Sequence, residues 1–521
     1  MTQKKETQPN IILIMADDMG FSDIGCYGSE IETPNLDRLA YGGLRFSQMY
    51  NCARCCPTRA SLLTGLYPHQ AGIGHMVRDI GVGPAYQGYL RSDCLTVAEL
   101  LKKEGYRTLM SGKWHAGGDY APDKPDSWTP GDEKHPLPVQ RGFDEHYGML
   151  GGAGSYFNPP YMVTDDQIIH EGREGYYITD AISEHAVDMI ERNHTEGPFF
   201  MYVAYTAPHW PLHALPADIE KYVGTYKDSG WDGIREQRYQ RLLDMGLISK
   251  NSHLSPRDEQ SHPWSQVEEK EWEDLRMAVY AAQVDRMDQG IGKIMDTVSE
   301  LGLEEDTLVM FLSDNGGCAE FMAEDSNQPQ PSRYNVPTYD GRPVCVGNTP
   351  NINPGPDDTF VSYDLPWANA SNTPFRYFKH WVHEGGIATP FIAYWPKAIQ
   401  DQQIIHTPWH LVDITATCLA VAGSSAVLEG VSFLPVLTGD NKSYQRDKPI
   451  FWEHEGNRAV RMGDWKLVRR YPGDWELYNM SQDRTELHDL AKQERERVSQ
   501  MVKLYEDWTV RCGVLEWPIQ T

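Results

Sequence analysis

The sequence predicts an α/β protein with a large, mostly parallel sheet sandwiched by helices and a smaller C-terminal α+β domain that carries an antiparallel sheet. Three observations support this fold class. Short apolar runs alternate with segments of helical periodicity, which is typical of β-α-β units. The runs are apolar at every position, as expected of strands covered on both faces. Beyond residue 449 the patterns shorten, which indicates short antiparallel strands and a final helix.

The large sheet should be built from five apolar runs separated by helices. The predicted strands, in chain order, are NIILIM (10–15), YRTLM (106–110), PFFMYVAY (198–205), TLVMFL (307–312) and PFIAYWP (390–396). The predicted helices are TVAELLKKEG (96–105), DAISEHAVDMIERN (180–193) and residues 271–301. Gly105 and Gly302 should end the first and the last of these helices, because glycine readily adopts the left-handed conformation found after a helix.

Three stretches do not show this alternation of apolar strands and helices. Residues 212–270 are rich in charge and residues 318–372 in Pro, Asn, Asp and Gly, and we expect both to be long insertions over the surface. The polar segment GDNKSYQRDKP (439–449) should be a linker. We therefore predict a large domain at residues 1–438 and an antiparallel-sheet plus helix subdomain at residues 439–521.

The composition excludes several classes of function. The chain of 521 residues carries a formal net charge of −27, which argues against nucleic acid and anionic membranes as partners. No run approaches the ~20 apolar residues of a membrane span. The polar start MTQKKETQPN lacks the apolar core of a secretory leader. We expect a cytoplasmic protein, or a periplasmic or secreted one from which a leader has been removed.

Polar residues follow four of the predicted strands at the point where each strand ends. Each residue alone has an ordinary structural explanation, as a turn, a cap or a buried histidine. In an open parallel sheet, however, the carboxyl ends of the strands meet at one edge, where ligands bind. We therefore expect these side chains to lie together. They are Asp17 and Asp18, then Lys113 and His115, then His209, and finally Asp314 and Asn315.

The oxygen-bearing members of this set indicate a metal site. Asp17, Asp18, Asp314 and Asn315 offer the hard oxygen ligands that Ca²⁺ and Mg²⁺ prefer. Neighbouring carboxylates without a cation would repel one another and shift their pKa values. A divalent cation at this edge of the sheet would remove that repulsion.

The stretch NCARCCPTRASLLTG (51–65) allows three interpretations. A zinc site would need a second ligand pair, which the sequence does not offer. A vicinal disulfide between Cys55 and Cys56 would be strained. The third interpretation is a helix that starts near Pro57 and ends at Gly65, with Cys55 at its N-terminus and Arg59 one turn on. A nucleophile, a cation and a helix N-terminus together suit a tetrahedral oxyanion such as sulfate or phosphate.

The cysteine usage does not indicate a disulfide framework, because nine cysteines are an odd number and are sparse in a chain of this length. Those outside the cluster at 52–56 lie far apart, and we expect them to be ordinary buried thiols. They are Cys26, Cys94, Cys318, Cys345, Cys418 and Cys512.

CCPTRASLLTG resembles the C-x-P-x-R-x4-T-G signature of type I sulfatases, which are formylglycine-dependent, arylsulfatase-like members of the alkaline phosphatase superfamily. The resemblance extends over nearly the whole chain and keeps the family order. The matching segments are MADDMG, TPNLDRLA, GKWH, APHWP, SDNGG, NTPFRYFKHWVHEGGIATP and GDWKLV…WELYNM.

The resemblance implies a role for each residue of the site. Cys55 would be oxidised by a maturation enzyme to formylglycine, whose hydrate is the nucleophile. Asp17, Asp18, Asp314, Asn315 and the modified Cys55 would hold Ca²⁺, with Mg²⁺ the less expected ion. Arg59 would bind the aldehyde hydrate, Lys113 and His115 would line the sulfate pocket, and His209 and Lys379 would contact the leaving-group oxygen. His209 would protonate the departing alcohol, and His115 would later remove a proton from the hydrate so that sulfate leaves.

The expected function is hydrolysis of a sulfate ester, either an aryl sulfate or a sulfated carbohydrate. One rival is a phosphate or phosphonate ester hydrolase of the same superfamily, and a second is a non-catalytic protein that binds a sulfated ligand. Aromatic residues in or near the loops beside the site could stack on a sugar or an aryl group. They are Tyr156, Phe157, Tyr161, Trp210, Trp231 and Trp367.

Overall fold

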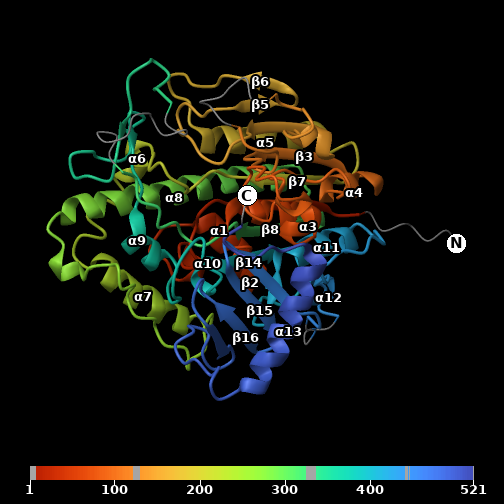
Figure 1. Cartoon of the computed structure of the whole chain (residues 1–521). Helices are drawn as coiled ribbons and strands as arrows, with labels where there is room; N and C mark the ends of the chain where they lie inside the picture. Colours follow the sequence, from red (N-terminus) through yellow and green to blue (C-terminus); the bar gives the residue numbers. More distant parts are fainter. Residues whose placement is uncertain (1–7, 121–128, 324–335, 441–443, 445, 520–521) are drawn as a thin grey trace.

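The computed structural model describes residues 8–120, 129–323, 336–440, 444 and 446–519. An eleven-stranded sheet forms its centre (Figure 1). The strands are β1 (Asn10–Ala16), β2 (Leu44–Tyr50), β3 (Arg107–Gly112), β4 (Glu145–Met149), β5 (Met162–Thr164), β6 (Gln167–Ile169), β7 (Phe199–Ala204), β8 (Thr307–Ser313), β11 (Ala388–Tyr394), β12 (Gln403–Ile405) and β13 (Trp409–His410).

The sheet is mixed, with a parallel centre. The strand order is β12-β2-β11-β8-β1-β7-β3-β4-β5-β6, and β13 pairs with β2. Strands β8, β1, β7, β3 and β4 are parallel to their neighbours in this run. All five predicted strands form, but β11 runs antiparallel to both β8 and β2. A run that is apolar on both faces does not encode its direction, so the sequence could not reveal this reversal.

Helices cover both faces of the sheet because successive side chains of each strand point to opposite sides. In β1, Ile12 and Ile14 belong to the core formed with α5 and α8, whereas Ile11 and Leu13 belong to the core formed with α2, α4 and α11. The helices are α2 (Cys55–Thr64), α4 (Val97–Lys103), α5 (Ile178–Asn193), α8 (Lys270–Glu300) and α11 (Leu411–Val421). The three predicted helices are thus confirmed.

The caps of these helices follow from local chemistry. The Thr96 hydroxyl accepts a hydrogen bond from the Glu99 amide at 3.1 Å, and the Glu99 carboxylate accepts one from the Thr96 amide, so α4 begins with a capping box. Gly105 and Gly302, predicted to end α4 and α8, have φ of 90° and 70°. Both lie in the left-handed region that favours glycine.

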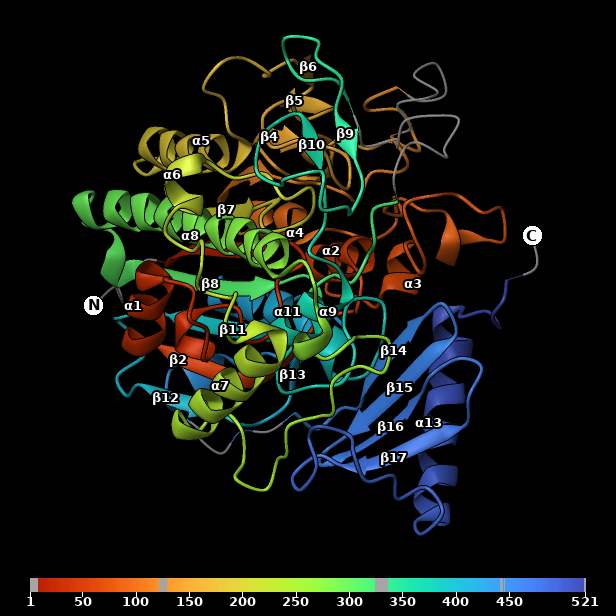
Figure 2. The ribbon, with the colours of Figure 1, turned by 90° about the vertical axis from the view of Figure 1, so that its left-hand side faces the viewer.

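The C-terminal part contains a four-stranded antiparallel sheet, as predicted, in the order β14-β15-β16-β17. Helix α13 packs on one face of it, where Trp508 stacks on Phe451 at 5.2 Å (Figure 2). Buried polar contacts join this sheet to the rest of the molecule, including a 2.7 Å bond from the Trp452 indole to the Asn51 carbonyl. The elements are β14 (Ile450–His454), β15 (Asn457–Met462), β16 (Trp465–Arg469), β17 (Trp475–Asn479) and α13 (Arg495–Cys512).

Residues 212–270, expected to be a long insertion over the surface, are more ordered than that expectation, and some of their side chains are buried. They contain α6 (Pro216–Ile219) and α7 (Gly230–Asp244). The side chain of Arg238 in α7 is fully buried and pairs with Asp23 at 2.6 Å and Glu30 at 2.7 Å. The acidic partners lie about two hundred residues earlier in the chain, so this charged helix had no visible reason to be buried until the fold brought them together.

Residues 318–372 are also more ordered than expected. The described part contains β9 (Cys345–Val346), β10 (Thr359–Phe360) and α9 (Asp364–Ser371). Two of the three tryptophans expected near the site are core residues instead: Trp231 and Trp367 are 3% and 0% exposed and pack edge to face at 5.4 Å. Tyr156 is likewise buried. Residues 324–335 of this stretch lie outside the described residues.

All nine cysteines are free thiols. Five of the six cysteines expected to be buried thiols are buried, whereas the sixth, Cys345, is exposed; Cys52, Cys55 and Cys56 are buried as well. Among the described residues, no helix combines the length and apolarity needed to cross a membrane.

Candidate active site

The carboxyl edge of the parallel strands gathers the polar residues predicted to meet there. Asp17, Lys113 and Asp314 follow directly on β1, β3 and β8. Backbone hydrogen bonds keep these strand ends in register: the Asp314 amide donates to the Ala16 carbonyl at 3.1 Å, and the Lys113 amide donates to the Ala204 carbonyl at 2.7 Å. Residues distant in sequence therefore share one small, buried volume.

Three carboxylates lie at the centre of this volume. Asp17, Asp18 and Asp314 are 0–1% exposed. Burial and the neighbouring Asp314 carboxylate raise the pKa of Asp17 well above its usual range, and burial raises the pKa of Asp314 as well. Asp17 Oδ1 and Asn315 Oδ1 are buried without a hydrogen-bond partner. Oxygens that are crowded, buried and unpaired are the donor set of a hard cation, so these residues fit Ca²⁺ or Mg²⁺.

Helix α2 presents Cys55 to the same volume from its N-terminus. The helix begins at Cys55, two residues before the predicted start at Pro57, and ends before Gly65, whose φ is 66°. A hydrogen bond from the Cys56 thiol, together with the positive charge of Lys113, outweighs burial and lowers the pKa of the Cys55 thiol well below its usual range. A helix N-terminus, where free N–H groups point outward, favours negative charge in the same way.

Cationic side chains surround the carboxylates and the N-terminus of α2. The Arg59 guanidinium, one turn into α2, donates to Asp314 Oδ2 at 2.8 and 3.1 Å and to the Lys113 carbonyl at 2.9 Å. Lys113 Nζ lies 2.5 Å from Asp17 Oδ2. Both cations are fully buried. This density of positive charge next to Cys55 suits an anionic group bound against the helix N-terminus.

His209 and Lys379 form the opposite wall. Lys379 Nζ lies 2.8 Å from Asp18 Oδ2 and 3.4 Å from His209 Nε2, and His209 Nε2 lies 3.2 Å from Asp18 Oδ2. His209 Nδ1 donates to the Trp210 carbonyl at 2.7 Å, which leaves Nε2 to accept the Lys379 proton. Burial lowers the pKa of His209 to about 3, so this imidazole is neutral at pH 7. Lys379, which lies outside any regular strand or helix, is brought here by the tertiary fold.

His115 lies beside the N-terminus of α2. Its imidazole and the thiols of Cys55 and Cys56 each place one atom within 4.8 Å of the other two. Burial lowers the pKa of His115 to about 4, so it is a neutral base at pH 7. Its backbone has φ of 48°, an uncommon value for a residue with a side chain, which places the imidazole next to residue 55.

Two residues that the sequence analysis missed complete the entrance. Glu320 accepts a hydrogen bond from the Trp210 indole at 2.9 Å and pairs with Arg54 at 2.8 Å. Burial raises the pKa of Glu320, but the charges of Lys379 and Arg54 outweigh it and hold this carboxyl ionised. The two residues line a cavity of about 270 Å³ together with Cys318, Ala319, Phe378, Lys379, His380 and Trp381. Only Arg54 carried a signal in the sequence, as the neighbour of Cys55.

A second group of possible metal ligands, His380, His454 and Glu455, lies close by, and its carboxylate already pairs with imidazole N–H groups. The Glu455 carboxylate accepts a hydrogen bond from His75 Nε2 at 2.8 Å and pairs with His380 Nδ1 at 3.3 Å. The Asn457 amide donates to His380 Nε2 at 3.3 Å, which assigns the His380 proton to Nδ1. Two imidazole N–H groups thus already contact Glu455, whereas both ring nitrogens of His454 are buried without a hydrogen-bond partner.

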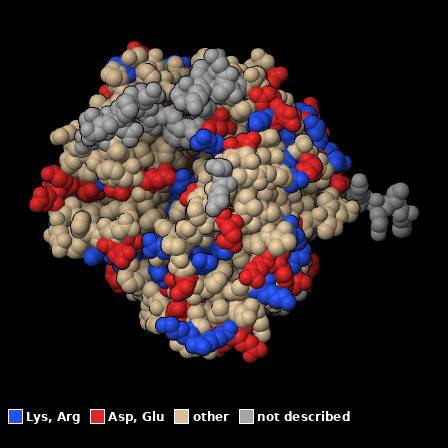
Figure 3. Space-filling view, in the orientation of Figure 1, with Lys and Arg blue, Asp and Glu red and all other residues tan. Residues whose placement is uncertain are grey.

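Charges of both signs are interspersed over the face drawn in Figure 3, without one dominant basic area among the residues coloured there. The cations of the site are instead buried. An anionic substrate is therefore held by local contacts inside the site rather than by a long-range field of a protein whose net charge is −27.

The parallel sheet, the thiol at a helix N-terminus and the surrounding cations define a hydrolase of tetrahedral oxyanion esters. Residues 9–424 match the sulfatase family, and residues 374–507 match the family described as N-sulphoglucosamine sulphohydrolase, C-terminal. The chain belongs to the sulfatase family, as a type I sulfatase, and is a sulfuric ester hydrolase.

Several proteins are similar to this chain over most of its length. An uncharacterized sulfatase of Schizosaccharomyces pombe is 31% identical over 99% of this chain and 96% of its own. The arylsulfatase of Klebsiella aerogenes is 34% identical over 80% of this chain and 88% of its own. The crystal structure of Ps i-CgsB in complex with k-i-k-neocarrahexaose aligns with a TM-score of 0.67 and 28% identity, covering 96% of this chain and 93% of that one.

Proposed function

We propose that the enzyme hydrolyses the sulfate ester of a sulfated carbohydrate or an aryl alcohol, with formylglycine made from Cys55 as the nucleophile and a bound Ca²⁺. The observation that carries this proposal is the meeting of Cys55, at the N-terminus of α2, with three buried carboxylates and with the cations Arg59, Lys113 and Lys379. An anionic ester group fits only where such cations offset the carboxylates.

The proposed cation would be held by Asp17, Asp18, Asp314 and Asn315, with the modified residue 55 completing its ligands. The unpaired oxygens of Asp17 and Asn315 support this assignment. When bound, a Ca²⁺ ion would supply positive charge that polarises the ester and lowers the pKa of a hydroxyl on residue 55. A hydrated aldehyde at residue 55 would supply two hydroxyl groups, so that after one has been used the other remains to release sulfate.

Different residues of the chain would then bind the sulfate group and transfer the protons. Lys113 and Lys379 would bind the sulfuryl oxygens, and Arg59 would orient the hydroxyls of residue 55, for which Asp314 is the adjacent proton acceptor. Lys379 Nζ would supply the proton to the departing oxygen, and His209 Nε2, at 3.4 Å, would position that ammonium by accepting its hydrogen bond. His115, neutral and beside residue 55, would accept the proton whose removal frees sulfate.

The test uses enzyme produced together with a formylglycine-generating enzyme. Mass spectrometry of the peptide that contains residues 55–59 should show exchange of sulfur for oxygen and carbonyl reactivity at Cys55. Modification of Cys52 or Cys56 instead would overturn the assignment. Turnover of 4-nitrophenyl sulfate and of sulfated sugars should disappear in Cys55→Ala, and a preference for the matching phosphate esters would contradict the proposal.

A further inference from the structure

A second cavity lies next to the cavity of about 270 Å³ that Lys379 lines, which we call the catalytic cavity. The second cavity has a volume of about 470 Å³. Tyr377 lines this second cavity and Trp381 lines the catalytic cavity, and their ring centroids are 5.4 Å apart. The chain segment that carries Lys379 therefore separates the two cavities, and an aromatic pair connects them. The charged residues that line the second cavity include Arg257, Asp258, Glu259, Arg376 and Arg470.

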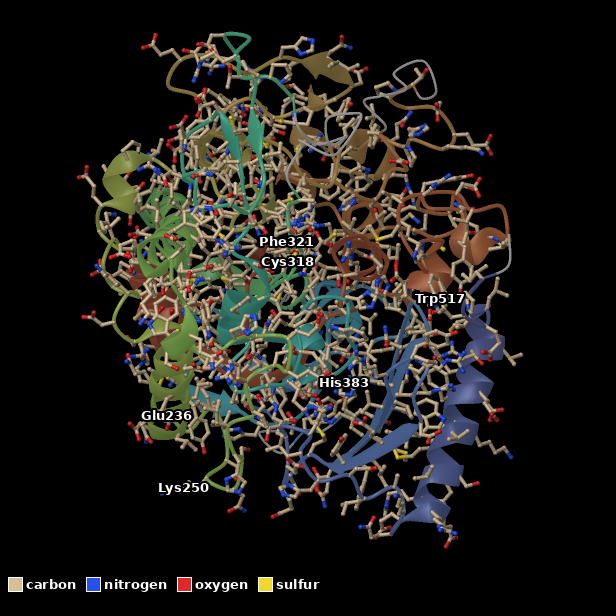
Figure 4. All side chains as sticks on the ribbon, turned by 60° about the vertical axis from the view of Figure 1, so that its left-hand side comes forward. Glu236, Lys250, Cys318, Phe321, His383 and Trp517 are labelled. Atoms are coloured by element: carbon tan, nitrogen blue, oxygen red, sulfur yellow. The ribbon has the colours of Figure 1, made fainter. Side chains whose placement is uncertain are left out.

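Figure 4 shows where this region lies in the molecule. Cys318, in the wall of the catalytic cavity, and His383, whose ring packs edge to face on Tyr377 at 4.8 Å, are labelled between the green part of the chain and the blue C-terminal sheet. Arg470 follows β16 of that sheet directly. The C-terminal sheet thus contributes a side chain to a surface that continues to the catalytic lysine.

Arg470 has unused hydrogen-bonding capacity. Its guanidinium lies 4.7 Å from the ring centre of Trp381 and 5.4 Å from that of Tyr377. Its only side-chain hydrogen bond among the described residues is a 3.4 Å bond to the Tyr377 hydroxyl, and no described carboxylate lies within ion-pair distance of it. Stacking on aromatic rings fixes a guanidinium while its N–H groups remain available to an anion.

The other two guanidiniums of this cavity are already engaged. Arg257 pairs with Asp232 at 2.8 Å, and Arg376 donates to the Glu486 carbonyl at 2.6 Å. The carboxylates of Asp258 and Glu259 line the same cavity and offer acceptors for hydroxyl groups. A cavity with aromatic faces, hydroxyl acceptors and one available guanidinium matches a sugar that carries an anionic group.

We propose that the substrate is a sulfated glycan with a second anionic group, a sulfate or a carboxylate, which Arg470 binds while the reacting sulfate lies at Lys379. The sugar ring next to the reacting one packs against Tyr377 and Trp381. This inference rests on the proposed function of the catalytic site and specifies its substrate class.

Competition with a small reporter substrate tests the inference. The wild type hydrolyses 4-nitrophenyl sulfate, and a chondroitin sulfate tetrasaccharide or an iota-carrageenan tetrasaccharide should inhibit this reaction competitively. In Arg470→Ala the inhibition constant should rise about tenfold or more, because a charge-assisted contact is lost. Arg470→Lys should lose less, and kcat/KM for the reporter should change less than threefold.

Arg469→Ala is the matched control. Arg469 is the preceding residue, and its side chain donates to the Gly473 carbonyl rather than stacking on the aromatic pair. This variant should keep the wild-type inhibition constant. Equal inhibition of the wild type and Arg470→Ala, or no inhibition of the wild type by either oligosaccharide, would overturn the inference.

A binding measurement separates this inference from the proposed function. Isothermal titration of Cys55→Ala with the same tetrasaccharides needs no turnover. It should give binding that weakens about tenfold or more when Arg470→Ala is added to Cys55→Ala. Absence of turnover of every sulfate ester by the wild type would contradict the proposed catalytic chemistry, whereas unchanged binding in the double variant would contradict the role of Arg470.

Discussion

Removal of the His209 imidazole should slow the enzyme according to the alcohol that it releases. His209 Nδ1 donates to the Trp210 carbonyl, and Nε2 faces Lys379 Nζ at 3.4 Å, so the only described proton donor adjacent to Nε2 is the Lys379 ammonium. Burial lowers the pKa of His209 to about 3, and the resting imidazole therefore carries no spare proton at pH 7. Burial also lowers the pKa of Lys379, but the adjacent Asp18 outweighs it and keeps the ammonium protonated. We therefore expect the Lys379 ammonium to supply the proton to the departing oxygen, while His209 Nε2 positions that ammonium by accepting its hydrogen bond.

The expected magnitude follows from the leaving group. A sugar alkoxide is a poor leaving group and needs the full benefit of general-acid catalysis, about 10²–10⁴ in rate, which corresponds to about 3–5 kcal/mol of barrier. A 4-nitrophenolate leaves without much protonation, so His209→Ala should lose less than about tenfold with 4-nitrophenyl sulfate. Lys379→Ala should lose more with every ester, because Lys379 is also proposed to neutralise the sulfuryl oxygens.

The assay is rapid-mixing kinetics with a series of aryl sulfates and one sulfated sugar. A plot of the rate ratio of wild type to His209→Ala against the leaving-group pKa should rise steadily. His406→Ala serves as a control, because His406 bonds to Ser47 in a separate cavity. A ratio that is the same for every leaving group would refute the reasoning and would leave His209 a sulfate-binding residue.

Four further predictions concern the metal, sulfate release and stability. Chelation of the metal should abolish turnover, and added Ca²⁺ or Mg²⁺ should restore it. In thermal denaturation, the ion at 100 times its Kd should stabilise the fold by about 2.7 kcal/mol. Recovery of turnover with Zn²⁺ alone would contradict the hard-cation site. His115→Ala should release one equivalent of alcohol per enzyme in stopped-flow traces and then stall, and steady turnover would exclude the proposed role. Lys466→Met should destabilise the fold by about 3–5 kcal/mol in denaturant titrations, because buried Glu486 loses the cation at 2.7 Å and buried Glu384 loses one of two paired cations and keeps Arg484. Burial raises the pKa of Glu455, but two paired histidines and a third nearby outweigh burial and lower this pKa to about 2. The ionised Glu455 therefore contributes at most about 3 kcal/mol of stability, which is present above pH 4.5 and lost as the pH falls toward 2. Glu455→Gln should flatten the dependence of the unfolding free energy on pH over that range.

The sequence predicted the parts of the fold that depend on local patterns. Apolar runs located β1, β3, β7 and β8, and the rule that ligands bind at the carboxyl ends of parallel strands identified Asp17, Lys113 and Asp314 as neighbours. The helix signals around Cys55 placed it at an N-terminus, with an error of two residues. These predictions succeeded because strand periodicity, helix caps and the polarity of a parallel sheet are set by short stretches of chain.

Only the tertiary structure decided the features that depend on distant partners. Periodicity carries no direction, so it did not show that β11 is antiparallel. The burial of Arg238 required Asp23 and Glu30, and the burial of Trp231 required Trp367. For these residues the free energy of burial comes from a partner that the local sequence does not contain.

The same limit applies to the site. Family resemblance, not local pattern, pointed to Lys379, because it follows no strand, and nothing in the sequence indicated that Glu320 would pair with Arg54 at the entrance. Arg470 directly follows strand β16 of the C-terminal sheet, and its position over Trp381 exists only because that sheet packs beside the segment that carries Lys379. The sequence by itself thus determined the chemistry available at the carboxyl edge of the sheet, and the packing of separate segments decided which cations and aromatic rings surround it.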